Sequence, residues 1–226
     1  MAHNAAGIVY PPIISSALPT FEVDHNAFWT TYPDYQDEDM DVARKDIARV
    51  AKRYYHDVFP RQRTTIYDYC SESFSAQLKK RIFGAYPPTQ LVAVVAKPAN
   101  PKFFPIHHFV FAANCAKFPQ LLDVPPDPIK SEMVTLPVSA IVLRSPTAFS
   151  ILWNYLYSGN INRVYRQLVL KPLDERKAVI RGFWETLFDL EVVDRKLYDI
   201  TIKAWDECLW EFQLAMPQLN GSPSNY

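Results

Sequence analysis

The residues best suited to chemistry in this 226-residue chain are two adjacent histidines, His107 and His108, and a nearby cysteine, Cys115. Imidazoles and thiolates bind zinc, and a cysteine beside a histidine can act as a nucleophile. Neighbouring residues point to different sides of a strand or helix, so it is awkward for both rings to reach one metal ion. No Cys-x-x-Cys or His-x-x-x-His spacing supplies further ligands. We expect one histidine to be hydrogen-bonded in the core and the other to be exposed.

A cysteine nucleophile at position 115 would also need an orienting third group and an oxyanion cradle, and the sequence marks neither. Glycine is scarce, with 5 residues, which argues against loops that cradle phosphate. We therefore expect no enzymatic activity, no metal site and no cofactor.

A second candidate is a basic stripe in the segment 44–63. Its side chains are Lys45, Arg49, Lys52 and Arg53, followed by Arg61 and Arg63. A helix could lay these along a phosphate backbone. Asp46 and Asp57 interleave with them, however, and Asp46 is a helical neighbour with which Arg49 can pair. A solvated, internally paired face is the preferred interpretation, and a DNA contact is the alternative.

A third candidate is the segment 28–41, which mixes four aromatic residues with five acids. The aromatic residues are Phe28, Trp29, Tyr32 and Tyr35. Aromatics interleaved with acids are typical of segments that fold on binding a partner. We take these four as candidate partner-binding residues; the alternative is that they dock onto the surface of their own domain.

Charge and composition bound the remaining possibilities. Lys plus Arg and Asp plus Glu number 24 each, so no global field draws the chain to nucleic acid or anionic lipid. No apolar run is long enough to span a membrane, and the N-terminal sequence lacks the pattern of a secretion signal. Three dispersed cysteines suit a reducing compartment. We expect an intracellular protein, nuclear and/or cytoplasmic.

The chain is predicted to begin with an extended, partly disordered arm over residues 1–38, which has no sustained period. An N-terminal helical segment follows over 39–88, with one helix from Asp39 to Pro60 and a second over 71–83. Residues 91–97 are predicted to form a buried strand, and residues 103–109 to return beside it as a second strand. Residues 133–137 are predicted to form another strand, and residues 107–118 could be helical.

The stretch SPTAFSILWNYLYSGN, residues 145–160, predicts a sharply bounded core helix. Ser145 suits the N-cap, Pro146 the first helical position and Gly159 a left-handed end. Two longer helices follow, capped by Asp174 and Asp194. The predicted core residues are His107, Phe118, Phe149, Trp153, Gly159, Trp184 and Trp205.

From about Gln90 to Gly159 the sequence resembles a BTB/POZ domain. FPIHHFVFAANCAKFPQLL carries the family's helix that opens on a histidine, MVTLP its further strand and SPTAFSILWNYLYSGNI its closing helix with a Tyr-x-Gly end. The resemblance implies an α+β fold, a small sheet of short strands covered by helices, with an N-terminal helical arm. It places the domain at 89–215, with a flexible tail at 216–226, and makes Cys115 a core residue.

In its insertions and its choice of residues the sequence is most similar to the clampless-type regulators of sexual development in basidiomycete fungi. That resemblance implies a non-enzymatic protein-protein interaction module that controls clamp-cell formation and the dikaryotic state. The implied partners are other proteins, such as mating-type homeodomain or other transcription factors. The alternative is a DNA-associated transcription factor that uses the 44–63 basic helix. The segment before the first strand departs from the dimerising BTB pattern, which leaves open whether the protein is a monomer or a homodimer.

Overall fold

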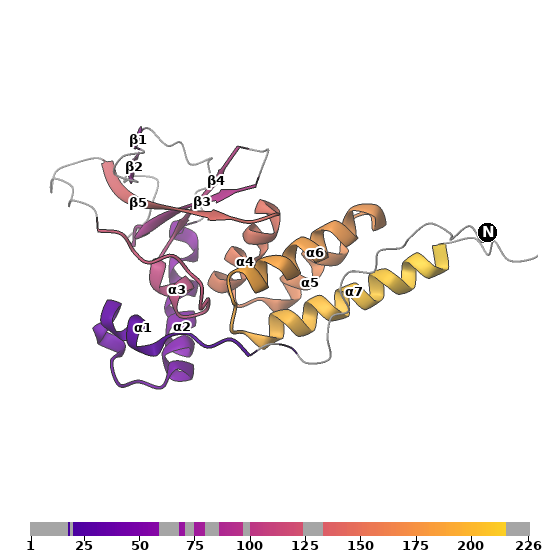
Figure 1. Cartoon of the computed structure of the whole chain (residues 1–226), viewed down its shortest axis with the longest axis horizontal. Helices are drawn as coiled ribbons and strands as arrows, with labels where there is room; N and C mark the ends of the chain where they lie inside the picture. The colour runs from indigo at the N-terminus through magenta and orange to yellow at the C-terminus, as the bar shows by residue number, and fades with distance from the viewer. Residues whose placement is uncertain are drawn as a thin grey trace, which may run out of the picture.

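The computed structural model describes residue 18 and the ranges 20–58, 68–70, 75–79, 86–96, 100–123 and 133–215. Within these residues the chain forms seven α-helices, one 3-10 helix and a five-stranded sheet. Figure 1 shows the sheet along one side, helices α2, α3 and α4 beneath it, and α5, α6 and α7 extending away from it. The predicted α+β class, a small sheet of short strands covered by helices, is confirmed.

The sheet is mixed and has the strand order β1-β2-β5-β3-β4. Its strands are β1 (Asp68–Cys70), β2 (Ser75–Lys79), β3 (Gln90–Val95), β4 (Lys102–Ile106) and β5 (Met133–Val142). The central pair, β3 and β5, is parallel, and the other neighbours are antiparallel. All three strands predicted between residues 91 and 137 are confirmed.

Strand β3 is apolar from Leu91 to Val95 because both of its faces are covered. Val92 and Val94 belong to the main core, together with Ile106 of β4. Leu91 and Ala93 point to the opposite face, where they join a second, smaller core with residues of β2 and β5. An uninterrupted apolar run is what a strand buried on both faces requires.

Two sequence predictions in the first 88 residues are wrong. The helix expected over 71–83 is replaced at residues 75–79 by β2, which pairs with β5. Ala76 and Leu78 are buried and Gln77 between them is exposed, which is the alternation of a strand. Apolar residues in this segment also recur every four positions, and that spacing led to the prediction of a helix. The 1–38 arm is not extended throughout, because it contains α1 (His25–Thr31) and the 3-10 helix η1 (Pro33–Tyr35).

Helix α2 (Met40–Val58) forms where its apolar spacing predicts it. The predicted 107–118 helix is shorter than expected: α3 spans only His108–Ala112. The chain then turns, and Cys115 forms a bridge with Val192 in the connection between α6 and α7. Parts of the predicted arm and the whole of the predicted tail, residues 1–17 and 216–226, lie outside the described residues, as do residues 124–132.

Helix α4 (Pro146–Ser158) has both of its predicted ends. The Ser145 side chain accepts a hydrogen bond from the Ala148 N–H at 3.2 Å, and Pro146 is the first helical residue. Gly159 has a φ of 64°, the left-handed conformation that ends a helix at low cost for glycine. The helix is buried almost all round, so its apolar stripe is confirmed as core.

Helix α5 (Ile161–Val169) begins directly after that stop and was not predicted; Asn160 caps it by accepting a hydrogen bond from the Arg163 N–H at 3.0 Å. Helices α6 (Leu173–Asp189) and α7 (Arg195–Ala215) confirm the two predicted long helices. The predicted cap at Asp174 is wrong, because Asp174 lies in the first turn of α6 and the N-cap residue is Pro172. Helix α6 passes close to α4: a Cβ placed on Gly182 would lie 2.9 Å from the Ser145 Cβ. The absence of a side chain at Gly182 permits this close packing.

The predicted core residues divide by exposure. His107, Phe149, Trp153 and Trp205 are buried, Phe118 and Trp184 are partly buried against the core, and Gly159 is exposed. Among the described residues, no helix has the length and apolar character needed to cross a membrane.

Trp153 provides a test of this core. Its side chain is 5% exposed, and its indole N–H donates to the Pro105 carbonyl at 3.1 Å. Trp153→Ala should lower the free energy of unfolding by about 3–5 kcal/mol, because it leaves a cavity and an unpaired carbonyl. Trp210 of α7 is 61% exposed, so Trp210→Ala should change it by less than about 0.5 kcal/mol. Denaturant unfolding of both variants measures the difference, and equal losses would contradict this placement.

Candidate functional site

The two adjacent histidines bind different parts of the molecule. His107 is the N-cap residue of α3 and faces α4, whereas His108 is the first residue of α3 and faces α1. Because the two rings diverge, they do not converge on one ligand. Among the residues that the structure describes, no three His, Cys, Asp or Glu side chains are grouped so that they could hold a metal ion.

His107 is 3% exposed and forms part of the core. Its backbone N–H donates to the Tyr157 hydroxyl at 2.7 Å, and its ring Nδ1 lies 3.2 Å from the same oxygen. Its Nε2 lies 3.2 Å from the Tyr86 carbonyl. Burial raises the pKa of Tyr157, so its hydroxyl stays protonated. These contacts fix the start of α3 against α4.

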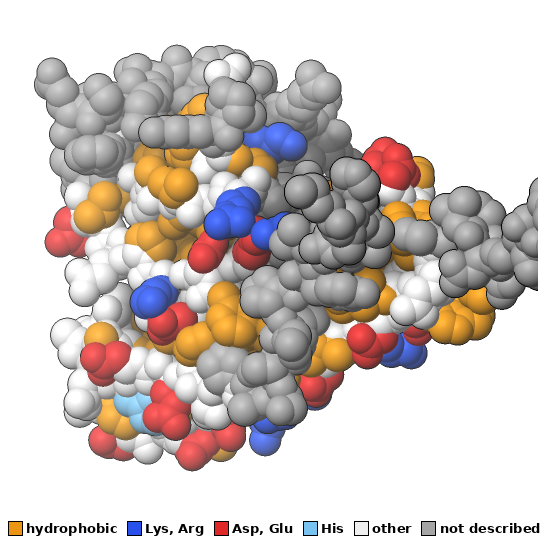
Figure 2. Space-filling view, turned by 45° about the vertical axis from the view of Figure 1, so that its right-hand side comes forward, with side chains coloured by type: hydrophobic (Ala, Val, Ile, Leu, Met, Phe, Trp, Pro, Cys, Tyr) orange, Lys and Arg blue, Asp and Glu red, His pale blue; other side chains and the backbone are white. Residues whose placement is uncertain are grey.

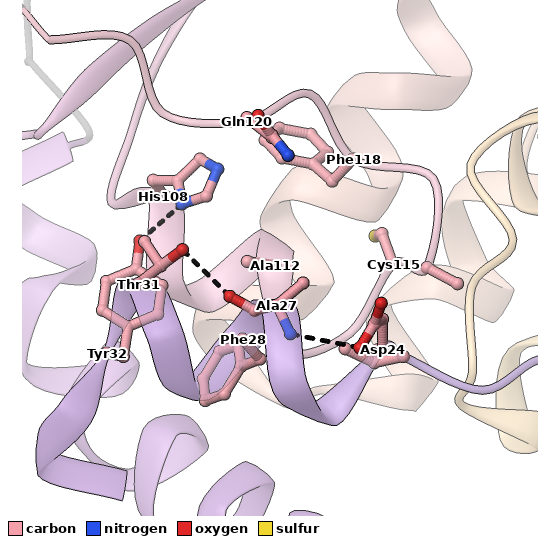
Figure 3. A pocket seen from close by; sticks show the side chains of 12 residues that line it. Asp24, Ala27, Phe28, Thr31, Tyr32, His108, Ala112, Cys115, Phe118 and Gln120 are labelled. Carbon is pink, nitrogen blue, oxygen red and sulfur yellow. Dashed lines mark hydrogen bonds between the residues drawn. The ribbon is translucent and has the colours of Figure 1, made fainter. Parts of the chain in front are cut away.

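His108 is also buried, at 4% exposure, so the prediction that one of the pair is exposed is wrong. The reason is α1, which covers this ring (Figure 3). The Nε2 of His108 lies 2.8 Å from the Pro119 carbonyl and therefore carries the proton, which leaves Nδ1 to accept from the Tyr32 hydroxyl. Burial lowers the pKa of His108, although the bond to Pro119 opposes this shift.

A small pocket of about 100 Å³ lies between α1 and α3. Figure 3 shows Phe28 of α1 and Tyr32, directly after α1, on one side, and His108, Phe118 and Cys115 on the other. The lining is more apolar than polar, and its polar side chains include Asp24, Thr31 and Gln120. Such a space suits the packing of α1 on the domain better than the binding of a polar substrate.

Cys115 is unsuited to nucleophilic catalysis. Its thiol is 2% exposed, and burial raises the pKa well above its usual range, so the reactive thiolate is disfavoured. The interpretation of Cys115 as a core residue is confirmed.

The four candidate partner-binding aromatics pack on their own domain to different extents. Phe28 is 3% exposed in the core, and Tyr32 is held by His108. Trp29 and Tyr35 are partly buried and pack against the same core. Phe28 and Tyr32 therefore attach α1, and Trp29 and Tyr35 retain exposed surface. A partner role for these residues stays a prediction.

The basic stripe lies on the exposed side of α2. Lys45, Arg49, Lys52 and Arg53 are all exposed, and Arg49 pairs with Asp46 at 3.1 Å, as expected. Arg61 and Arg63 lie outside the described residues. On the face seen in Figure 2, basic and acidic side chains are interspersed over the centre, and acidic side chains gather at the lower left.

His108 predicts a pH dependence of stability. In the unfolded chain its pKa is about 6.5, and in the folded protein burial lowers it. Between these two values the unfolded state binds more protons, so the free energy of unfolding is maintained above about pH 6.5 and falls as the pH drops below it. Urea unfolding from about pH 7.5 to about pH 5.5, roughly one unit either side of the unfolded pKa, measures this slope.

His108→Gln should flatten the slope, because an amide does not titrate in this range. His25→Gln is the matched control, since His25 is exposed on the same helix that covers His108. Retention of the full slope in the His108 variant would contradict this assignment.

Sequence reasoning missed Tyr157 and Asn160, and it missed the pairing of Tyr32, a candidate partner-binding residue, with His108. The Tyr32–His108 contact joins residues 76 apart and the His107–Tyr157 contact joins residues 50 apart, so no local pattern marks either pair. The cap at Asn160 did have a local signal, an asparagine directly after the glycine that ends α4.

Comparison with known proteins gives one similarity. Residues 35–143 match the family model of the Clampless protein 1 N-terminal domain. No curated protein and no solved structure matches the chain significantly. The chain is thus similar to the clampless family from η1 to the end of β5, as the sequence resemblance implied.

Proposed function

We propose that this protein is a non-enzymatic protein-protein interaction module that regulates sexual development in a basidiomycete fungus. Its role is the control of clamp-cell formation and of the dikaryotic state, and it acts inside the cell, in the nucleus and/or the cytoplasm. The observation that carries the proposal is the match of residues 35–143 to the Clampless protein 1 N-terminal domain.

The geometry supports an interaction role over a catalytic one. Cys115, the candidate nucleophile, is a buried thiol with a raised pKa, and the two adjacent histidines attach α1 and α4 to α3. A nucleophile needs a thiolate and access to substrate. The residue types that could do chemistry thus serve the packing of the domain.

We also propose a BTB/POZ-like organisation for the domain. The order β3, β4, α3 with His107 at its N-cap, β5 and α4 follows the order of elements that the resemblance implies. The domain limits of 89–215 and the choice between monomer and homodimer belong to this proposal. The proposed partners are other proteins, among them mating-type homeodomain or other transcription factors.

A DNA-associated factor is the second candidate. The exposed Lys45, Lys52 and Arg53 favour it, because cations on one helix can contact phosphates. Against it stand the pairing of Arg49 with Asp46 and the zero net charge. The charges of the chain therefore fit an interaction module better than a DNA-binding factor.

Removal of the gene from a clamp-forming basidiomycete should abolish clamp cells in the dikaryon, and reintroduction of the wild-type chain should restore them. Cys115→Ala should restore them equally well, because the side chain is proposed to pack and not to react. Clamp-cell counts and immunoblots of the variant provide the measurement. Loss of clamp cells with normal levels of the Cys115 variant would reject the non-enzymatic proposal.

Trp29 and Tyr35 should contribute to partner recovery. Trp29→Ala combined with Tyr35→Ala should reduce the proteins captured by the tagged chain from cell extract at least several-fold, since aromatic anchors dominate many interfaces. Trp210→Ala is the matched control, because it also removes a large aromatic side chain from the surface. Quantitative mass spectrometry compares the three captures. Equal recovery by all three proteins would remove these residues from the interface.

A further inference from the structure

We infer that five basic side chains on helices α2 and α5 form one surface that binds an acidic peptide segment of a partner protein. They are Lys45, Lys52, Arg53, Arg163 and Arg166, and we call them the α2–α5 basic surface. The inference rests on the proposed function, because it takes the partner to be a protein.

The two helices are far apart in sequence, but specific contacts join them. The Arg163 Nη1 donates to the Tyr55 hydroxyl of α2 at 2.8 Å, across 108 residues. Lys52 lies over the junction between α4 and α5: a Cβ placed on Gly159 would be 3.2 Å from the Lys52 Cε. The cations of α2 therefore continue onto α5, which the sequence stripe alone did not show.

The five charges of this surface have no carboxylate partner among the described residues, whereas ion pairs are common elsewhere. On the other helices, for example, Arg176 pairs with Glu211 at 2.8 Å and Arg181 with Glu185 at 3.1 Å. The five side chains are exposed and make none of the described ion pairs. Their mutual repulsion is compensated when a negative ligand binds.

The α5 part of the surface has the chemistry of a carboxylate site. Asn160, Asn162, Arg163 and Arg166 line an open hollow of about 390 Å³. Guanidinium groups donate two parallel hydrogen bonds to a carboxylate, and the asparagine amides add further donors. The bond from Arg163 to Tyr55 orients its guanidinium group before a ligand arrives. All four lining residues are polar or basic, so the hollow suits an acidic side chain better than an apolar one.

The layout favours an acidic peptide over nucleic acid. Lys45 and Lys52 are two helical turns apart, about 10 Å, a distance that an extended peptide spans in about three residues. The Arg49–Asp46 pair lies within the stripe and would place a carboxylate beside a phosphate backbone. Duplex binding draws on many phosphate contacts and a field of one sign, and this chain has a net charge of zero.

The test uses the full chain and two labelled probes, an oligoglutamate peptide and a random-sequence DNA duplex. Lys52→Glu combined with Arg166→Glu reverses two charges on the surface without removing the Arg163–Tyr55 bond. The matched control is Arg195→Glu combined with Lys196→Glu, which makes the same charge change at the start of α7. Thermal unfolding confirms that both variants fold, and fluorescence anisotropy measures binding.

We expect the wild type to bind the peptide with an affinity that falls as salt rises, the surface variant to bind at least about tenfold more weakly, and the control to stay within about twofold. Three results would overturn the inference: equal loss in both variants, no binding of peptide by the wild type, or tighter binding of the duplex than of the peptide. If the wild type captures partner proteins from cells but does not bind the peptide, only the role of the α2–α5 basic surface is rejected. If the chain binds the peptide but removal of its gene leaves clamp cells unchanged, only the proposed function is rejected.

Discussion

The structure depends on the burial of one helix, α4. Nine of its thirteen residues are buried, and they lie on all sides of the helix. A helix that is apolar all round has no face to turn to water, so other elements must enclose it. Helices α2, α3, α5 and α6 and strand β3 all contact it. These elements come from both halves of the chain, so the helix unites the sheet with the C-terminal helices.

The polar atoms on α4 determine how those elements are oriented around it. The Tyr155 hydroxyl donates to Asp194 at 2.6 Å just before α7, and the Tyr157 hydroxyl accepts from the His107 N–H at the start of α3. The Asn154 amide oxygen accepts from a tyrosine of α2. An unpaired polar group in a core is costly, so these hydrogen bonds must be kept. Apolar packing alone would allow the neighbouring elements to rotate against α4, whereas the hydrogen bonds hold them in one orientation. Burial therefore holds α4 in the centre, and its hydrogen bonds fix the arrangement of its neighbours.

Whether a feature of this fold could be predicted from the sequence depends on how far apart in the chain the interacting residues lie. The ends of α4 were predicted because Ser145 and Gly159 act within a few residues of themselves. Strand β2 was not, because its identity comes from pairing with β5, more than fifty residues away. The burial of His108 depends on α1, a segment whose helix is capped by Asp24 but whose stability comes from docking. Helix α5 was hidden for a different reason: a glycine stop was read as the end of helical structure, although an asparagine cap restarts it at once.

The family match and the candidate surfaces divide the chain differently. Residues 35–143 include α2, α3 and the sheet but not α4, so the core that holds the matched segment is completed by residues outside it. Neither proposed surface lies within the match alone: α1 precedes it, and α5 follows it. The aromatic helix α1 docks on α3 through His108, and the basic stripe of α2 gains its second half from α5. A segment limited to residues 35–143 would lose the enclosed helix and part of each surface, so the proposed partner contacts require the whole domain that α4 organises.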